Sequence, residues 1–313
     1  MITTITLNAA VDKTYFVNQF QVGQVHRVAK MLVEPGGKGI NVAKVVRELG
    51  ETVTASGWIG GSNGQLIEQS LLARGILCRM VQVHGESRVC LNIIDAEANS
   101  STEILEPGPV VEEQQLAQLM QVYDELVRES SVVVLSGSMP QGVEVDFYAK
   151  LVKRAKQQGT FVILDTSGKA LSAAVDAVDA VPNMLKPNAQ ELEQLVGASI
   201  QSDEELYNQA RRFMQSGVDY MMMTRGADGV IAGIDGELYH AEGLRVNVVN
   251  TVGCGDSFVA GVAVGIHRGL PAQEMLALAV ATSASNAMNQ GAGQIRLDDV
   301  RRLQSQVVVR RIH

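Results

Sequence analysis

The chain has 313 residues, of which 46% are hydrophobic and 19% charged, so it can bury a large core and is not intrinsically disordered. Its formal net charge of −8 argues against a surface built to bind nucleic acid. The longest apolar stretches, such as 259–266, are far shorter than the roughly 20 residues that span a bilayer, and the N-terminus lacks a signal-peptide pattern. We therefore expect a soluble, cytoplasmic protein.

Strand-like and helix-like segments alternate along most of the chain. Compact apolar runs predict strands at 2–7, 52–58, 131–135, 161–165 and 220–224. Apolar residues at helical spacing predict helices at 40–49, 66–74, 111–129, 144–158, 203–216, 257–268 and 273–289. Short buried strands separated by helices are typical of a mostly parallel sheet with helices on both faces. We predict one α/β domain that spans residues 1–313.

Two segments interrupt this alternation. Residues 13–35 are rich in aromatic and β-branched side chains without helical spacing, and residues 88–95 have strand composition with no helix directly after them. We therefore predict a small β appendage, formed by about 13–35 and 88–106 and inserted in the domain.

The strongest local pattern is a glycine-rich turn that opens an apolar helix, at Asn250–Phe258 (NTVGCGDSF). Glycines let successive N–H groups point to one spot, and the helix N-terminus adds positive charge, which suits a transferring phosphoryl group. Asp256 could accept the proton of an attacking hydroxyl, and we expect the nearby N–H groups to lower its pKa. Taken alone, Asp256 is more simply explained as a helix cap.

A second pattern lies at Lys186–Glu191 (KPNAQE). Asn188 and Glu191 have capping-box spacing, which alone indicates a well-capped helix. In a functional interpretation, Lys186 and Asn188 approach nucleotide phosphates. Glu191 would then hold Mg²⁺ through water, because Mg²⁺ keeps several waters and needs few carboxylates.

A third pattern, Pro35–Asn41 (PGGKGIN), resembles a phosphate-binding loop without matching the Walker A motif. Leu32 stands where that motif has its first glycine, and Gly39 stands where it has Ser or Thr. An ordinary glycine turn into a helix is an equal alternative. Two further turns, at Ser136–Pro140 and Thr224–Gly229, follow predicted buried strands, where open α/β sheets bind ligands. On local grounds a plain turn is an equal alternative for both.

Together and in this order, these residues resemble the ribokinase-like (PfkB-type) carbohydrate kinase family, in its hexose-phosphate branch. The matching segments cover nearly the whole chain: TLNAAVD at 6–12, GGKGINV at 36–42, SGSMP at 136–140, LDTSG at 164–168, KPNAQE at 186–191 and TVGCGD at 251–256. The resemblance implies a three-layer α/β domain with a β-sheet lid, ATP and Mg²⁺ as cofactors, a sugar phosphate as substrate, and a homodimer that pairs through the lids.

The resemblance also implies a role for each matching residue. Asp256 is the expected catalytic base, and the expected anion hole comprises Gly253, Cys254 and Gly255. The residues expected to bind the sugar phosphate are Asp12, Gly37, Lys38, Asn41, Arg88 and Ser138. The residues expected to bind ATP are Lys186, Asn188, Thr224, Gly226, Asp228, Gly229, Thr251 and Asn286, with Glu191 as the Mg²⁺ ligand through water.

Several positions depart from the usual family pattern, among them Cys254 and the triplet Arg88–Cys90. Cys254 replaces a more usual alanine or serine, and a thiol near a helix N-terminus is expected to be reactive. The triplet Arg88–Cys90 (RVC) is more similar to tagatose-6-phosphate kinases, whereas many 1-phosphofructokinases read Arg-Ile-Asn. We expect ATP-dependent phosphorylation of fructose 1-phosphate to fructose 1,6-bisphosphate, with conversion of tagatose 6-phosphate to tagatose 1,6-bisphosphate as the alternative.

Two other classes of function compete with a kinase. A non-catalytic sugar or nucleotide sensor on the same fold is disfavoured because Asp256 and the glycines around it are present. An NAD-dependent dehydrogenase is disfavoured because the first predicted strand leads into Asn8–Asp12 (NAAVD) and not into a Gly-x-Gly-x-x-Gly turn.

Overall fold

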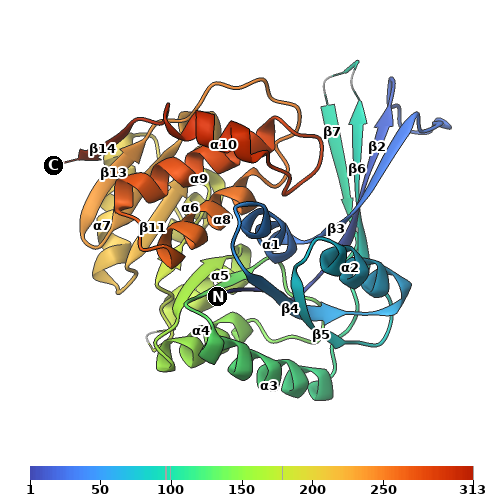
Figure 1. The fold of residues 1–313 in the computed structure, drawn as a ribbon, viewed down its shortest axis with the longest axis horizontal. Helices are drawn as coiled ribbons and strands as arrows, with labels where there is room; N and C mark the ends of the chain where they lie inside the picture. The colour runs from blue at the N-terminus through green and yellow to red at the C-terminus, as the bar shows by residue number, and fades with distance from the viewer. Residues whose placement is uncertain (96, 99, 178, 313) are drawn as a thin grey trace.

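The computed structural model describes residues 1–313 except 96, 99, 178 and 313. Its main body has three layers, in which helices cover both faces of a ten-stranded sheet, and a separate four-stranded sheet stands to one side (Figure 1). The predicted α/β class with a mostly parallel central sheet is confirmed. No helix in the described part of the chain is both long and apolar enough to cross a membrane.

The central sheet has the strand order β14-β13-β12-β11-β10-β9-β8-β1-β4-β5. Its parallel part runs from β5 to β11 and comprises β1 (Ile2–Thr6), β4 (Val53–Ile59), β5 (Leu77–Gln82), β8 (Val132–Ser136), β9 (Phe161–Asp165), β10 (Met184–Leu185) and β11 (Tyr220–Thr224). Three antiparallel strands extend it at one edge, namely β12 (Val230–Ile234), β13 (Glu237–Ala241) and β14 (Val309–Ile312).

The helices divide between the two faces of this sheet according to the hydrophobic cluster that they join. One face carries α1 (Lys38–Glu48), α2 (Gly61–Ala73), α8 (Cys254–His267), α9 (Ala272–Ala287) and α10 (Leu297–Gln304). The other carries α3 (Glu113–Glu129), α4 (Phe147–Gln157), α5 (Gly168–Asp176), α6 (Ala189–Val196) and α7 (Asp203–Gln215). Every predicted helix is present within a few residues of its expected bounds.

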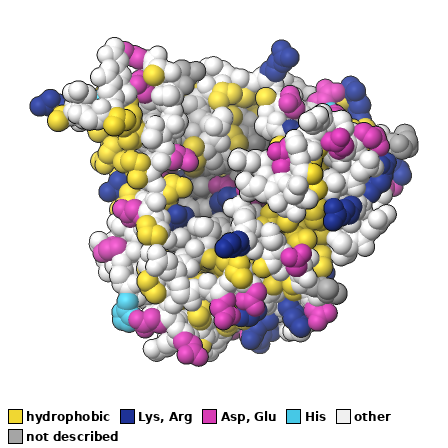
Figure 2. Space-filling view, turned by 180° about the vertical axis from the view of Figure 1, so that it is seen from behind, with side chains coloured by type: hydrophobic (Ala, Val, Ile, Leu, Met, Phe, Trp, Pro, Cys, Tyr) yellow, Lys and Arg dark blue, Asp and Glu magenta, His cyan; other side chains and the backbone are white. Residues whose placement is uncertain are grey.

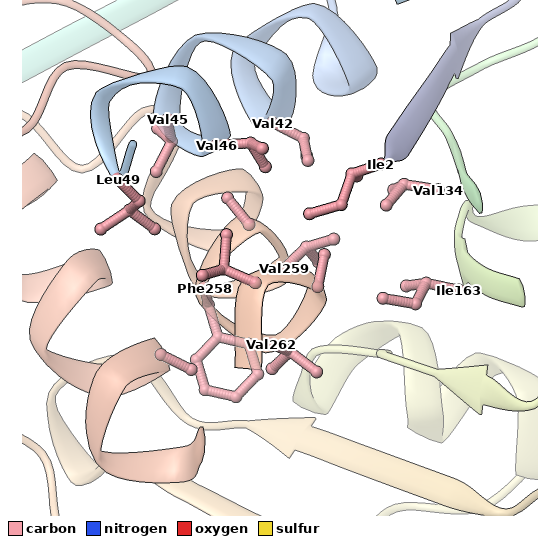
Figure 3. Packing of buried hydrophobic residues seen from close by; sticks show 14 of the residues in the cluster. Ile2, Val42, Val45, Val46, Leu49, Val134, Ile163, Phe258, Val259 and Val262 are labelled. Carbon is pink, nitrogen blue, oxygen red and sulfur yellow. The ribbon is translucent and has the colours of Figure 1, made fainter. Parts of the chain in front are cut away.

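Packing of α1 and α8 on the sheet fixes the two helices whose N-termini reach the site. Figure 3 shows Val42, Val45, Val46 and Leu49 of α1 lying over Phe258, Val259 and Val262 of α8, beside Ile2, Val134 and Ile163 of the strands. All ten side chains are buried. Burying each such side chain contributes about 1.5–3 kcal/mol, so this contact holds both helix N-termini firmly.

The four-stranded sheet comprises β2 (Ala10–Val17), β3 (Lys30–Gly36), β6 (Arg88–Asp95) and β7 (Ser100–Leu105), in the order β3-β2-β6-β7. We call it the small sheet. Its strands fall in or next to the segments predicted for the appendage, and it begins three residues earlier, at Ala10. That it acts as a lid stays a prediction.

Candidate active site

The site lies where the carboxyl ends of parallel strands meet the N-termini of α1, α6 and α8, beneath the small sheet. A cavity of about 670 Å³ occupies this place. In Figure 2, Lys and Arg side chains lie where the small sheet, at upper left, adjoins the main body. The structure brings the following predicted site residues together around the cavity: Asp12, Gly37, Lys38, Asn41, Arg88, Lys186, Asn188, Glu191, Thr224, Gly226, Gly253, Gly255 and Asp256.

Asp165, at the carboxyl end of β9, organises two of the cations. Its Oδ1 lies 3.1 Å from Lys38 Nζ and 3.3 Å from Lys186 Nζ, and its side chain is only 1% exposed. Burial alone would raise the pKa of Asp165, but the two ammonium groups outweigh it and lower the pKa. Asp165 therefore stays charged and holds both lysines at the floor of the cavity.

Asp256 lies in the first turn of α8 and is 7% exposed. Its Oδ2 accepts a hydrogen bond from Asn41 Nδ2 at 2.8 Å. Burial, and then the nearby Asp165 charge, raises the pKa of Asp256 to about 6. The expectation of a lowered pKa is wrong, because burial destabilises the charged carboxylate more than the nearby positive groups stabilise it. A pKa of about 6 suits a base that works near neutral pH.

The turn before Asp256 is shaped by Gly253, the N-cap of α8. Its φ of 81° is the left-handed conformation that favours glycine, and a Cβ there would lie 2.7 Å from Gly293 N. Gly253, Gly255 and Asp256 all line the cavity, so the first turn of α8 borders the space next to the Asp256 carboxyl group. First-turn N–H groups have no partner within the helix and can stabilise an anion.

Arg88 and Asp12 come from the small sheet. Arg88 Nε donates to Asn8 O at 3.2 Å and Arg88 Nη1 donates to Glu106 O at 3.3 Å, which holds the guanidinium at the cavity wall. Burial raises the pKa of Asp12 to about 6, against the opposing charges of Lys44 and Arg88. The cavity thus has a cation at its small-sheet side and a carboxylate that can accept from a sugar hydroxyl.

The structure at the N-terminus of α6 is consistent with both interpretations of its sequence, as a helix cap and as a ligand-binding segment. Asn188 Oδ1 accepts from Glu191 N at 2.9 Å, and Glu191 Oε2 accepts from Asn188 N at 2.9 Å, so the capping box is complete. Both residues also line the cavity. Among the described residues no group of three or more acidic, histidine or cysteine side chains could hold a metal by itself. One carboxylate at the cavity wall fits a hydrated Mg²⁺ that takes its other ligands from water and phosphate.

A second, mainly apolar cavity of about 320 Å³ adjoins the first and shares Thr224, Gly226 and Gly255 with it. Its other lining residues are Ala227, Gly229, Val230, Gly243, Leu244, Val246, Val248, Thr251, Cys254, Phe258, Val280, Ser283, Ala284 and Ala287. A flat, largely apolar group such as a nucleotide base fits such a space. The shared residues lead from it to the α8 turn.

Three predicted site residues do not line either of these cavities. Ser138 is exposed beyond β8 and accepts a hydrogen bond from Asn8 Nδ2 at 3.4 Å. Asp228 is exposed in the turn before β12. Asn286 is fully buried in α9, where its Nδ2 donates to Val252 O at 2.9 Å and its Oδ1 accepts from Gln294 N at 3.2 Å. Asn286 supports the turn before α8 from behind.

Cys254 differs from its expected behaviour. Burial raises the pKa of its thiol, and Asn286 Nδ2 lies 3.4 Å from Sγ without reversing that shift. The expectation of a reactive thiol is wrong, because the thiolate is the reactive form and burial disfavours it. The main-chain N–H of Cys254 donates to Thr251 O at 3.2 Å.

Comparison with known proteins places this geometry in a family. Residues 5–298 match the family described as pfkB family carbohydrate kinase. A tagatose-6-phosphate kinase of Staphylococcus epidermidis is 36% identical over 310 residues, which cover 99% of each chain. Phosphofructokinase-2 from Escherichia coli, solved in complex with potassium, is 28% identical with a TM-score of 0.89, covering 97% of this chain and 98% of the other. A possible 1-phosphofructokinase from Thermotoga maritima is 25% identical with a TM-score of 0.89, covering 100% of both.

Proposed function

The chain belongs to the pfkB family of carbohydrate kinases, and we propose that it transfers the γ-phosphoryl group of ATP to a ketohexose phosphate. The observation that carries this proposal is the buried Asp256, with a pKa of about 6, next to the N–H groups of α8 and the Lys38–Asp165–Lys186 cluster. Base, anion-binding groups and cations converge there on one cavity.

In this proposal the sugar hydroxyl lies against Asp256 while Asp12 and Asn41 orient its neighbours. Arg88, at the small-sheet side of the cavity, binds the phosphate already present on the sugar, because a guanidinium matches phosphate with two N–H groups. Lys38 and Lys186 both form an ion pair with Asp165. We therefore assign Lys38 to the transferring phosphoryl group in place of the sugar's own phosphate.

Transfer forms a bond between the sugar oxygen and the γ-phosphorus and breaks the bond from that phosphorus to the bridging oxygen of ADP. Asp256 takes the hydroxyl proton. First-turn N–H groups of α8, with Lys38 and Lys186, stabilise the charge on the transferring group, which contributes more than base strength in such reactions.

ATP would lie with its base in the apolar cavity and its phosphates along Thr224, Gly226 and Gly255. Glu191 would hold Mg²⁺ through water, together with the phosphates. When bound, Mg²⁺ neutralises phosphate charge.

Two substrates fit this arrangement. Tagatose 6-phosphate is supported by the relative that is 36% identical over nearly the full chain. Fructose 1-phosphate is supported by the structure named as a possible 1-phosphofructokinase. Each is a ketohexose with a phosphate at one end and a primary hydroxyl at the other, so Arg88 and Asp256 can engage either one.

The test is ADP release with Mg²⁺-ATP and, in parallel, tagatose 6-phosphate, fructose 1-phosphate, fructose 6-phosphate and free fructose. We expect turnover of a ketohexose phosphate and a much lower kcat/KM for the free sugar. Preference for the free sugar would remove Arg88 as a phosphate ligand. Absence of turnover with every substrate would favour a non-catalytic sensor.

We also propose a homodimer that forms through the outer face of the small sheet. Strand register places Val33, Lys13, Leu91 and Ile104 in one row across the small sheet, and Val33 is 39% and Ile104 54% exposed. Exposed apolar patches of this kind mark interaction surfaces. Light scattering should give a dimer mass, and Ile104→Asp should give a monomer; a monomeric wild-type protein at micromolar concentration would contradict this proposal.

A further inference from the structure

Lys44 is a fully buried lysine of α1 that does not line the cavity. Its Nζ donates to Ala292 O at 2.7 Å and to Pro35 O at 3.1 Å, and no described carboxylate forms an ion pair with it. Burial lowers the pKa of this ammonium, against the charges of Glu34 and Asp12. Because a lysine is almost never fully buried without a reason, its two main-chain partners indicate what it does.

The first partner belongs to the segment between α9 and α10, which packs directly on the turn of the anion hole. A Cβ on Gly253 would lie 2.7 Å from Gly293 N and 3.0 Å from Ala292 Cα. A Cβ on Gly293 would lie 2.9 Å from Lys44 Cε and 3.0 Å from Asn41 Cα. In space, Lys44 packs on Gly293 and Gly293 packs on Gly253, and neither glycine has room for a methyl group. A shift of one of these residues therefore displaces the next.

The second partner, Pro35, belongs to β3 of the small sheet. Two side-chain hydrogen bonds join the same strand to the same segment. Lys30 Nζ donates to Gln290 Oε1 at 2.6 Å, and Gln294 Nε2 donates to Glu34 Oε1 at 2.7 Å. Lys44 makes the buried connection beneath them, and burial keeps its hydrogen bonds from competition with water.

We propose that Lys44 is a positioning residue, which fixes the anion-hole turn of α8 and ties it to the base of the small sheet. The proposal rests on the kinase function given above, in which the α8 turn stabilises the transferring phosphoryl group. Lys44 acts through Gly293 and Gly253 and touches no substrate. Asn41, one helical turn earlier, bonds Asp256, so α1 sets the position of both the base and the anion hole.

The test compares Lys44→Met, which keeps the length but removes the donors, with Lys44→Arg, which keeps donors and charge. Thr160→Val is the matched control, because Thr160 is also buried and its Oγ1 donates to Val127 O at 3.0 Å, at the end of β9 remote from Asp165. We expect Lys44→Met to lower kcat about 10–100-fold, since misplacement by about 1 Å costs about 100-fold. The KM for both substrates should change less than about 3-fold. Lys44→Arg, which keeps the donors but adds volume, should keep more of kcat than Lys44→Met, and Thr160→Val should lower only the melting temperature.

Hydrogen exchange gives a readout that does not depend on catalysis. Amides at 250–257 and 288–296 should exchange faster in Lys44→Met than in wild type, and not in Lys44→Arg or Thr160→Val. Unchanged exchange, or a folded Lys44→Met variant with kcat within about 3-fold of wild type, overturns the proposal. If Lys44→Met does not fold, Lys44→Gln takes its place with the same expected and contrary results. A wild-type protein without sugar-phosphate kinase activity removes the proposed function, whereas the exchange comparison still decides the role of Lys44.

Discussion

Replacing Asp256 with asparagine should abolish most activity and at the same time stabilise the fold. The folded protein raises the pKa of Asp256 to about 6 from a reference value of 3.8, first through burial and then through Asp165. One pKa unit corresponds to about 1.4 kcal/mol, so a rise of about two units means that the ionised carboxylate costs about 3 kcal/mol at pH 8. Asparagine keeps the shape and an oxygen for Asn41 Nδ2 without that charge.

The sign of this effect depends on pH. Below the reference value both the folded and the unfolded state carry a protonated Asp256, so the substitution gains nothing there. As pH rises from about 4 to about 6, wild type loses stability that Asp256→Asn keeps. In urea unfolding, the free energy of unfolding of Asp256→Asn should therefore exceed that of wild type by about 3 kcal/mol at pH 8 and by about half of that at pH 5.

Activity and a control variant complete this test. The kcat of Asp256→Asn should fall by about 100-fold or more, because a positioned base contributes about 10²–10⁴-fold. The control variant Asp165→Asn should instead be destabilised, with a free energy of unfolding about 3–5 kcal/mol lower than that of wild type. The reason is that it leaves Lys38 and the buried Lys186 without their carboxylate. A variant Asp256→Asn that is less stable than wild type at pH 8, or whose gain does not change with pH, would refute the reasoning.

Other substitutions and pH test the remaining parts of the site. Arg88→Ala should raise the KM for the sugar phosphate by an amount equivalent to about 2–5 kcal/mol while leaving the KM for ATP unchanged; equal KM values in variant and wild type would remove Arg88 from the phosphate site. Ala284→Phe should fill the apolar cavity and raise the KM for ATP at least about 10-fold, and steady-state kinetics at saturating sugar phosphate measures this. In wild type, kcat/KM should fall as pH drops below about 6, where Asp256 becomes protonated, and a flat profile down to pH 5 would contradict its role as base.

Local patterns predicted most of the fold because its parallel strands are compact apolar runs. The run at 220–224 coincides with β11, and the run at 161–165 with β9. The strand β10 was not predicted, since its two residues carry no periodicity. The antiparallel edge β12–β14 was also not predicted, because its last strand comes from the C-terminus, about 70 residues after β13.

The grouping of the motif residues around one cavity was predictable to a similar extent, whereas the pKa shifts of these residues were not. The motifs identified Asp256 and Lys186, but the direction of the Asp256 pKa shift depends on burial, which the sequence does not state. Asp165 lies within a recognised segment, yet its contact with Lys38 spans 127 positions. Lys44 interrupts the valines of α1 and is charged, so the pattern gave no sign that it is buried.

The small sheet joins the main body through four separate connections. These are the turn from β1 to β2, the junction of β3 with α1 at Gly37, and the links at 83–87 and 106–112. A sheet attached through four chain segments cannot tilt about one of them alone. Any swing of the small sheet must bend all four together, and one of them pulls directly on α1, which carries Lys38. In the proposed function, sugar binding by the small sheet and phosphoryl binding by Lys38 are therefore mechanically coupled.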